Sequence, residues 1–536
     1  MHRIFSSMIS WAWPDPDDYV PRAFYRSRIA TVLTFIYLFI LATVSSSAVP
    51  PTTGVPAPQV PQLRTFTEKA SINRLPIELL SQILVLWAAV DNEGPWMAAS
   101  ISKHWRNVVL SSPTAWGNLS LMLKNEEIKD TAWCGEEEDD RPPRGKRRPF
   151  ELWLQRSKGT KLSLAITAHN NYPLLEIELV NYCTMIAEHA HRLRFLTIDV
   201  ELLAVAETVL SSVSKMSLES LRIRVDQRRL PRRFNDSEMF IPWDRNLLRT
   251  SGHNANVMIF DGCFPSLSQS QVTTATTLEI RAAGIWGTHL LDLARSAPQL
   301  TTLKIRRMQA SHPDSQSPGI PPNLIVLPAL QYLSLQDVTM DFCADFFSCF
   351  DAPALQRLEI ENGGLRELRD MSRDGMTFSD ITSGFGTAFI QFTKRATGLR
   401  FLWLAKSGLH DRHFIEALRH TGALHEIRAD CLLIGAPIMR ALTPPIASMD
   451  KRQGKGKPLL CPNLQRLEIT RCDLMRGEHL VALIRARNHR CSRTSPITYL
   501  TVKGCKEVSE VHAEELHSVD PDDLQLRVEL CSKWMD

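Results

Sequence analysis

The sequence predicts an α/β protein in which a small helical unit is followed by a solenoid of repeated α/β units. Three observations favour this class. A short segment near residue 80 carries apolar residues at helical spacing and is bounded by turn residues. A six-residue pattern rich in leucine then returns many times, with helical stretches between its copies. The 536 residues, 44% hydrophobic and 22% charged, exceed one ordinary domain and can bury a large core.

Shifts in composition predict six regions along the chain. In order they are an N-terminal tail (1–28), a hydrophobic segment (29–48), a proline-rich linker (49–70), the helical unit (71–120), a charged linker (121–149) and the repeats (150–530). The basic half of the charged linker, Arg141–Pro149, could serve as a nuclear-import signal.

The hydrophobic segment leaves two interpretations open. Ile29–Val44 has no charged residue and follows three arginines. It is shorter than the about 20 apolar residues that span a bilayer comfortably, although the residues up to Val49 would extend it. Ser46-Ser47-Ala48 resembles a signal-peptide cleavage site. A membrane is therefore a candidate partner through residues 29–48; otherwise the segment is a leader without that role.

Charge and cysteine content favour a cytoplasmic or nuclear protein. The net charge of +4 is small for this length and predicts no nucleic-acid partner. The 11 cysteines are scattered and include no CxxC pair, which is typical of reduced thiols. The alternative location is membrane-anchored, through residues 29–48.

The helical unit begins at a helix that is apolar on more than one side. Pro76 suits a first helical turn, and Glu78 is favourable near the positive end of the helix dipole. A helix packed on one core needs an apolar stripe only about 100° wide. Here the apolar residues spread around roughly half of the circumference; they are Leu79, Leu80, Ile83, Leu84, Leu86 and Trp87. Because a short helical unit has little interior, we expect part of this surface to contact a partner protein.

The residues that follow predict a turn at Asp91–Pro95, one short helix through Met97, Ile101 and Trp105, and a stop at Ser111-Ser112-Pro113. Trp116 and Leu119 are expected to form a docking strand or turn.

This order of motifs resembles the F-box of the F-box-like families of mushroom-forming fungi. The matching residues are Leu75-Pro76-Ile77-Glu78-Leu79-Leu80, Trp105-Arg106, Ser112-Pro113 and Trp116, against LPxELL, a CRxWR-type run and SxPxLW. The chain departs at Ser102, where cysteine is more usual, and at Lys103 in place of arginine. Phe150–Ile166 is similar to the WLxRSxxxPLSLxI segment of the same families. An unrelated helical hairpin is the alternative interpretation.

The resemblance implies binding to the Skp adaptor, which links F-box proteins to a cullin–RING ubiquitin ligase. The residues that it assigns to adaptor binding are Leu75, Pro76, Glu78, Leu79, Leu80, Ile83 and Leu84, with Trp105 bracing or touching that surface.

The pattern LxxLx[IL] predicts the repeats. Its clearest copies begin at Leu218, Leu300, Leu330, Leu355, Leu399 and Leu464, and weaker copies begin at Leu193, Ala275, Leu424 and Ile497. Several neighbouring copies begin 25 residues apart, within the about 20–29-residue period of leucine-rich repeats. Longer gaps predict insertions, and we expect the polar tract Pro231–Gly262 to be one such loop. Separate α/β units with coincidental spacing are the alternative.

Alternation within each copy predicts a strand whose fourth and sixth residues point into the core. Between copies, His289–Ala297 predicts a helix with its apolar residues on one side, ended by Pro298. The third and fifth residues and the one after the copy would face a concave sheet surface. These residues are Ser220, Arg222, Arg224, Thr277, Glu279, Arg281, Thr302, Lys304, Arg306, Tyr332, Ser334, Gln336, Arg357, Glu359, Glu361, Phe401, Trp403, Ala405, Arg466, Glu468 and Thr470.

Two features of that surface predict where a client protein would bind. Positive charge gathers on Arg222, Arg224, Lys304 and Arg306, and an aromatic pair follows at Phe401 and Trp403. Arginines and aromatics are common energetic anchors of interfaces. The alternative is that a flanking loop covers both aromatics.

No pattern predicts a catalytic residue, a metal site or a cofactor. His189 and His191, like His410 and His413, lack further ligands at zinc-site spacing. Gly454–Lys457 lacks the frame of a phosphate-binding loop. We therefore expect a non-catalytic substrate receptor of a Skp–cullin–F-box ubiquitin ligase. The alternatives are a repeat scaffold outside any ligase, or a membrane-tethered or secreted leucine-rich-repeat protein.

Overall fold

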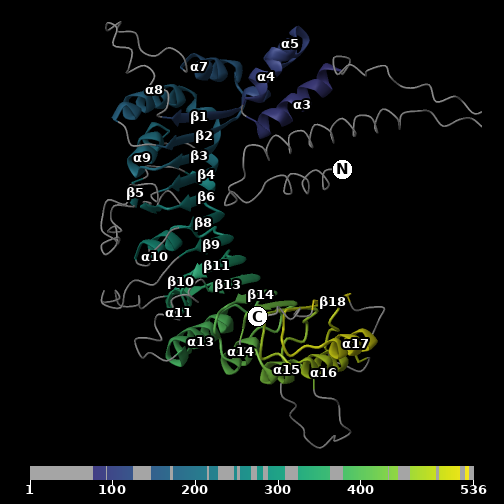
Figure 1. Cartoon of the computed structure of the whole chain (residues 1–536). Helices are drawn as coiled ribbons and strands as arrows, with labels where there is room; N and C mark the ends of the chain where they lie inside the picture. Colours follow the sequence, from purple (N-terminus) through teal and green to yellow (C-terminus); the bar gives the residue numbers. More distant parts are fainter. Residues whose placement is uncertain are drawn as a thin grey trace, which may run out of the picture. The chain divides into compact units, whose positions relative to one another are not determined.

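The protein is a mixed α/β structure with a large parallel sheet (Figure 1). This computed structural model describes residues 76–91, 93–124, 147–169, 173–213, 217–226, 247–249, 254–266, 274–281, 288–307, 324–362, 378–432, 434–444, 459–489, 494–519 and 525–529. They all belong to one compact unit, Asn73–Asp536. Leu75 and the segment 29–48 lie outside the described residues. No described helix is both long enough and apolar enough to span a membrane.

The helical unit consists of α3 (Ile77–Val90), α4 (Gly94–Ile101), α5 (Lys103–Ser111) and the 3₁₀ turn η2 (Pro113–Trp116). The sequence predicted one helix through Met97 and Trp105, but the chain forms two. Ser102 separates them because its backbone is extended and its Oγ accepts a hydrogen bond from the Trp105 N–H at 3.2 Å. This is a helix N-cap, which begins a new helix rather than continuing the previous one.

The main sheet has fourteen strands, and each bonds its neighbour in parallel. In spatial order they are β1 (Asn118–Lys124), β2 (Leu162–His169), β3 (Leu193–Val200), β4 (Ser217–Val225), β6 (Asn254–Asp261), β8 (Thr277–Arg281), β9 (Thr302–Arg306), β11 (Tyr332–Val338), β13 (Arg357–Asn362), β14 (Phe401–Ala405), β15 (Glu426–Asp430), β16 (Arg466–Thr470), β17 (Tyr499–Lys503) and β18 (Gln525–Glu529). Spatial order thus follows chain order, as expected for stacked repeats. Two short parallel pairs accompany it, β5 (Leu247–Arg249) with β7 (Phe264–Ser266) and β10 (Ile325–Val326) with β12 (Phe350–Asp351).

Helices connect the strands and pack against one face of the sheet (Figure 1). They are α7 (Arg147–Arg156), α8 (Pro173–His189), α9 (Leu203–Ser212), α10 (Thr288–Arg295), α11 (Met340–Cys349), α13 (Phe378–Arg395), α14 (Asp411–Leu418), α15 (Ala436–Leu442), α16 (Gly477–Asn488) and α17 (Glu510–Val519). Helix α10 matches the helix predicted at His289–Ala297, and its inward residues Leu290, Leu293 and Ala294 are buried.

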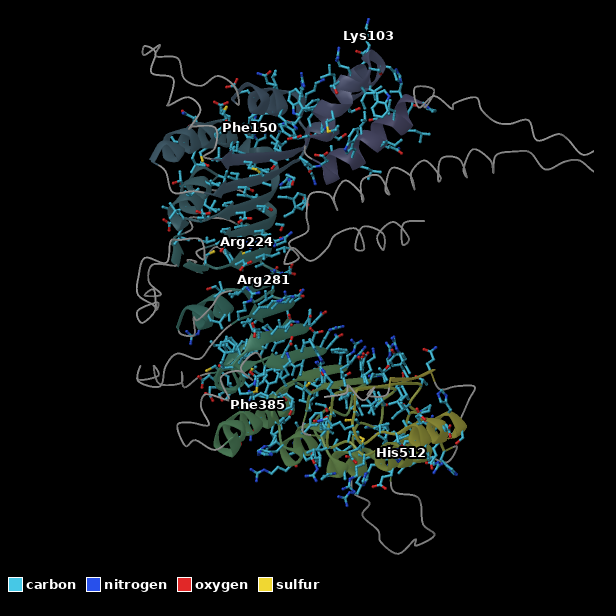
Figure 2. All side chains as sticks on the ribbon, viewed as in Figure 1. Lys103, Phe150, Arg224, Arg281, Phe385 and His512 are labelled. Carbon is cyan, nitrogen blue, oxygen red and sulfur yellow. The ribbon has the colours of Figure 1, made fainter. Side chains whose placement is uncertain are left out.

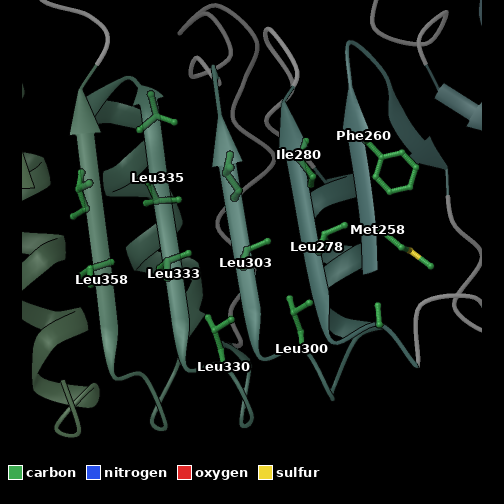
Figure 3. Close-up of a cluster of buried hydrophobic side chains, with 14 of the residues drawn as sticks. Met258, Phe260, Leu278, Ile280, Leu300, Leu303, Leu330, Leu333, Leu335 and Leu358 are labelled. Carbon is green, nitrogen blue, oxygen red and sulfur yellow. The ribbon is translucent and has the colours of Figure 1, made fainter. Parts of the chain in front are cut away.

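The core lies between these helices and the strands. Figure 3 shows the inward side chains of neighbouring strands in rows, for example Leu278, Leu303 and Leu333. These residues occupy the fourth position of their copies and are buried. Thr302 and Lys304 alternate with them and are half-buried on the other face. We call that other face, which points away from the helices, the far face.

The last part of one predicted loop is instead a strand, while residues 231–246 of that loop lie outside the described part of the chain. The tract Pro231–Gly262 contains β6, which pairs with β4 on one side and β8 on the other. Ala255, Met258 and Phe260 fill the inward positions that leucine or isoleucine fill elsewhere, and all three are buried. The prediction was wrong because non-leucine side chains of suitable volume can occupy the same core positions.

The region boundaries also differ from those predicted. Strand β1 begins at Asn118 and pairs with β2, so the predicted border between residues 120 and 121 falls inside the first strand of the sheet. Leu119, Leu121 and Leu123 all point into the core. The helical unit is therefore continuous in the chain with the first repeat strand.

The residue directly after a strand repeatedly adopts a left-handed backbone. Lys406, Arg471 and Gly504 have φ of 53°, 50° and 60°. The N–H of Lys406 donates to the Asp430 carbonyl at 2.9 Å, and that of Arg471 to the Lys503 carbonyl at 2.7 Å. Each corner therefore bonds the end of the next strand, which ties successive repeats together.

Candidate protein-binding surfaces

Four of the residues assigned to adaptor binding lie within the chain's own core. Leu80, Leu84 and Trp105 are buried, and Ile83 retains 8% of its exposure. Leu80, Leu84 and Trp105 pack with Val108, Val109 and Trp116 in the interior of the helical unit. Because Leu80 and Leu84 are buried within the chain, a partner protein cannot contact them. Their role is to pack α3 against the rest of the helical unit. Trp105 braces the unit and does not reach its surface.

A second apolar edge of α3 remains exposed. Leu79 and Leu86 are 42% and 40% exposed and lie seven residues apart, which places them on one side of the helix. Ile77 is 57% exposed, and Pro76 and Glu78 are exposed beside it. We call Leu79 and Leu86 the outer edge of α3; Ile83 borders it, whereas Ile77 lies in the first turn on the side of Leu80 and Leu84. Helix α4 adds exposed Met97 and Ile101, also on one side of their helix.

Clustered tryptophans connect the helical unit to the first repeat. The ring centroids of Trp96 and Trp116 are 5.0 Å apart, and each lies within 6.4 Å of Trp153 on α7. All three contacts are edge-to-face, a favoured geometry for aromatic pairs. The Arg156 guanidinium carbon lies 4.6 Å from the Trp96 and Trp116 ring centroids, and burial lowers the pKa of Arg156. This packing fixes the direction of α4 relative to α7.

The predicted basic residues of the early repeats share the far face. Figure 2 labels Arg224 and Arg281 on this part of the sheet. The backbone register aligns Arg222 with Ile259, and Arg224 with Asp261 of the strand that was not predicted. Arg224 lies 4.0 Å from both Asp226 and Asp261.

The acidic neighbours reduce the net charge of this patch. The Arg281 Nε–H donates to Glu279 at 2.7 Å, and Arg306 lies 3.8 Å from the same carboxylate. The Lys304 ammonium lies 5.7 Å from the centroid of the Tyr332 ring. Strand β6 adds Val257, Ile259 and Asp261, two apolar residues and one acidic residue, to a surface that the sequence predicted to be mainly basic.

The two aromatic candidates differ in exposure. Phe401 is buried, because the Arg357 guanidinium lies 4.0 Å from its ring centroid and that of Arg428 lies 5.3 Å away. Trp403 is half-buried and aligns with Glu359 and Arg428 on the neighbouring strands. Among the described residues, arginine side chains cover Phe401. Of the pair, only Trp403 offers apolar surface to a partner.

A hydrogen-bonded group surrounds the buried carboxylate of Glu359. It accepts from the Tyr332 hydroxyl at 2.7 Å, the Ser334 hydroxyl at 3.3 Å and the Arg357 Nε–H at 2.8 Å. Burial and the hydrogen bond to Glu359 raise the pKa of Tyr332. Three side chains donate hydrogen bonds to this carboxylate, and a fully hydrogen-bonded network of this kind restricts the motion of its members.

The histidine pairs have structural surroundings. His189 ends α8 and His413 lies on α14. Burial lowers the pKa of both rings, helped by nearby cationic side chains. Within the described ranges, no group of three or more His, Cys, Asp or Glu side chains could hold a metal ion.

A signal that the sequence analysis missed is the ninth residue of the repeats. In four units, counted from the first leucine position, it is Cys263, Ser407, Cys472 and Cys505, and all four side chains are buried. In other copies the ninth residue differs, for example Glu201, Val338 and Leu432. The Cys472 thiol donates to the Thr470 carbonyl at 3.4 Å, and that of Cys505 to the Lys503 carbonyl at 3.6 Å. Leucine-rich repeats place asparagine or cysteine at this position. Extending the search pattern by three residues would have found it.

The comparisons with known proteins add no family. No protein-family model matches the chain, and no curated protein matches it.

Proposed function

We propose that the protein is the substrate-receptor subunit of a Skp–cullin–F-box ubiquitin ligase. The observation that carries this proposal is the outer edge of α3. A helix that already closes its own core with Leu80 and Leu84 still exposes Leu79 and Leu86 on another side. Contiguous exposed apolar residues mark protein-binding surfaces in soluble proteins. These residues follow Pro76 and Glu78, within the stretch that resembles the F-box, so the proposed occupant is the Skp adaptor.

The repeats would bind the client. Parallel strands in chain order, intervening helices, the 25-residue spacing and the buried cysteine at the ninth position of three units support a leucine-rich-repeat solenoid. Its far face carries the arginines and Trp403, which are frequent anchors of protein interfaces.

The ligase chemistry would belong to other subunits. This chain would hold a client near a ubiquitin-charged enzyme and so raise its effective concentration. The packing of Trp96, Trp116 and Trp153 supports this role, because it connects the adaptor-binding helices to the repeats without a free hinge.

Co-purification with Skp and cullin subunits tests the proposal. We expect the full chain to capture both, and the double variant Leu79→Glu, Leu86→Glu to lose them. Leu474→Glu is a matched control, because it places the same charge on another exposed leucine, far along the chain in the repeats. It should bind as the parent does.

Failure of the parent chain to capture the adaptor would overturn the ligase role. The protein would then be a repeat scaffold outside any ligase. Equal loss of binding in the control would also contradict the proposal, since it would show a general loss of solubility. The membrane-tethered or secreted alternative depends on residues 29–48, outside the described part of the chain.

A further inference from the structure

The later repeats carry arginines held outward above carboxylates on the far face. Arg357, Arg428 and Arg466 have side chains 47%, 42% and 51% exposed. The acids beneath them, Glu359, Glu426 and Glu468, are 7%, 17% and 30% exposed. Charges on the two sets balance, yet a partner approaching this face meets guanidinium groups first. We call Arg357, Arg428 and Arg466 the guanidinium ladder.

Aromatic rings and carboxylates fix the orientation of these guanidinium groups. Arg357 lies between Phe401 and Tyr332, at 4.0 and 5.3 Å from their ring centroids. Arg466 lies 4.6 Å from the ring centroid of Tyr499. Planar guanidinium groups stack on aromatic faces while their N–H edges stay available. Binding therefore costs little additional side-chain entropy, because the rotamers are already restricted.

Donors remain available on the ladder. In the hydrogen bonds among described residues, Arg428 uses its Nε–H toward Glu426 at 2.7 Å, and its two Nη groups have no such bond. Arg357 uses Nε and Nη2 toward Glu359, which leaves Nη1. Each guanidinium has five N–H donors in a fork that matches a carboxylate.

The earlier repeats differ in this respect. Arg281 and Arg306 are only 12% and 26% exposed, and both lie against Glu279. Arg224 of the predicted basic patch is 38% exposed but lies 4.0 Å from both Asp226 and Asp261. The arginines of the ladder are more exposed than Arg224 and Arg306, so the later repeats are the better site for an anionic partner.

We infer that the guanidinium ladder binds an extended acidic segment of a client protein, with Trp403 contacting an apolar residue of that segment. The inference rests on the proposed client-receptor role and names the class of client. Three strand spacings of about 4.8 Å separate β13 from β16, so about five residues of extended chain would cross the ladder. Alternate side chains of such a segment point to one side about 6.7 Å apart, within reach of successive arginines.

The balanced charge argues against a nucleic acid as the occupant. Polyanion binding depends on net positive charge and release of counterions. The ladder offers directed, charge-assisted hydrogen bonds instead, which suit individual carboxylates.

Fluorescence anisotropy with the full chain tests this inference. The probe is a fluorescein-labelled nine-residue peptide of glutamates around a central leucine, and a glutamine version of equal length is the reference. We expect the glutamate peptide to bind at least about tenfold more tightly than the glutamine peptide. The variant Arg428→Gln, Arg466→Gln should weaken binding about tenfold or more.

Arg419→Gln, Arg485→Gln is the matched control. These arginines are 52% and 56% exposed and also form ion pairs with glutamates. Arg419 directly follows α14 and Arg485 lies on α16, so neither is on the far face. The control variant should bind within about twofold of the parent. Thermal melting of both variants checks that they are folded.

Equal weakening by the two variants, or no weakening by either, would overturn the inference. So would equal binding of the glutamine peptide, or tighter binding of a nine-nucleotide single-stranded oligonucleotide. The assay contains no adaptor, so its outcome is separable from the ligase role. A chain that binds the peptide but not Skp would keep this inference and lose the proposed function.

Discussion

Helix α3 is apolar on its inner side and again along its outer edge, whereas each repeat strand is apolar toward the helices and largely polar on the far face. Leu84 and Leu86 illustrate the first case, since one is buried and the other is 40% exposed. Ile305 and Lys304 illustrate the second, since the polar residue is the one that faces outward. Neighbouring repeats cover one another's apolar surface. In contrast, no repeat stacks on the outer edge of α3 among the described residues, so its apolar side chains stay exposed.

This difference predicts two kinds of binding. A partner of the outer edge of α3 would gain mainly from removing apolar area from water. A partner of the guanidinium ladder would gain mainly from charge-assisted hydrogen bonds, which salt screens.

The largest loss of stability is expected from a substitution at the turn directly after strand β6. Gly262 has a φ of +71°, and a Cβ there would lie 2.1 Å from the carbonyl oxygen of Val225. We expect Gly262→Ala to lower the free energy of unfolding by about 4 kcal/mol, from backbone strain plus the clash. Urea denaturation followed by circular dichroism measures this.

Gly504→Ala is the control for that corner. Gly504 has a similar φ of +60°, but its Cβ would meet only the Arg471 side chain, at 3.4 Å. The cost should be about 1 kcal/mol, from the left-handed backbone alone. Equal effects at the two glycines would show that β6 is not held against β4 as described.

Within the helical unit, the two sides of α3 should respond differently. Leu84→Ala removes a buried side chain and should lower the unfolding free energy by about 2 to 3 kcal/mol. Leu86→Ala should change it by about 0.5 kcal/mol or less, because that side chain is exposed. Thermal melting monitored by circular dichroism compares them. A large loss for Leu86→Ala would mean that the outer edge packs within the chain and is not free for an adaptor.

The smallest effect concerns pH. Burial, with the charges of Arg412 and His410, lowers the pKa of His413 in the folded chain. The unfolded chain then binds a proton more readily, so this residue's contribution is complete above about pH 6.5 and is lost as pH falls toward the folded pKa.

We therefore expect the drop in melting temperature between pH 7.5 and 5.5 to be smaller in His413→Gln than in the parent chain. His517→Gln, on an exposed position of α17, is the control and should leave the drop unchanged. Burial raises the pKa of Asp341 and Asp411, so these carboxyl groups change the stability with pH in the direction opposite to His413. Comparing each variant with the parent chain isolates the contribution of the substituted histidine. An unchanged drop in His413→Gln would contradict the prediction.

Much of the fold followed from the sequence. Each of the ten predicted copies contains a strand of the sheet, because strand alternation and the repeat period are local properties of the sequence. The missed strand β6 uses Ala255, Met258 and Phe260, whose suitability depends on the volume that neighbouring strands leave. Arg487 is a further case. Its residue type suggests a solvated helix face, yet its buried guanidinium bonds the carbonyls of Leu442, Leu460 and Cys461.

The sequence by itself determined which residues alternate along each strand, where the helical unit begins and that no familiar catalytic pattern is present. Only the tertiary structure decided which of these residues a partner can touch. Leu80 is enclosed and Leu79 is not, and Phe401 lies beneath Arg357 while Trp403 stays accessible. The physical reason is that exposure depends on side chains brought from distant parts of the chain, whereas periodicity depends only on neighbours in sequence.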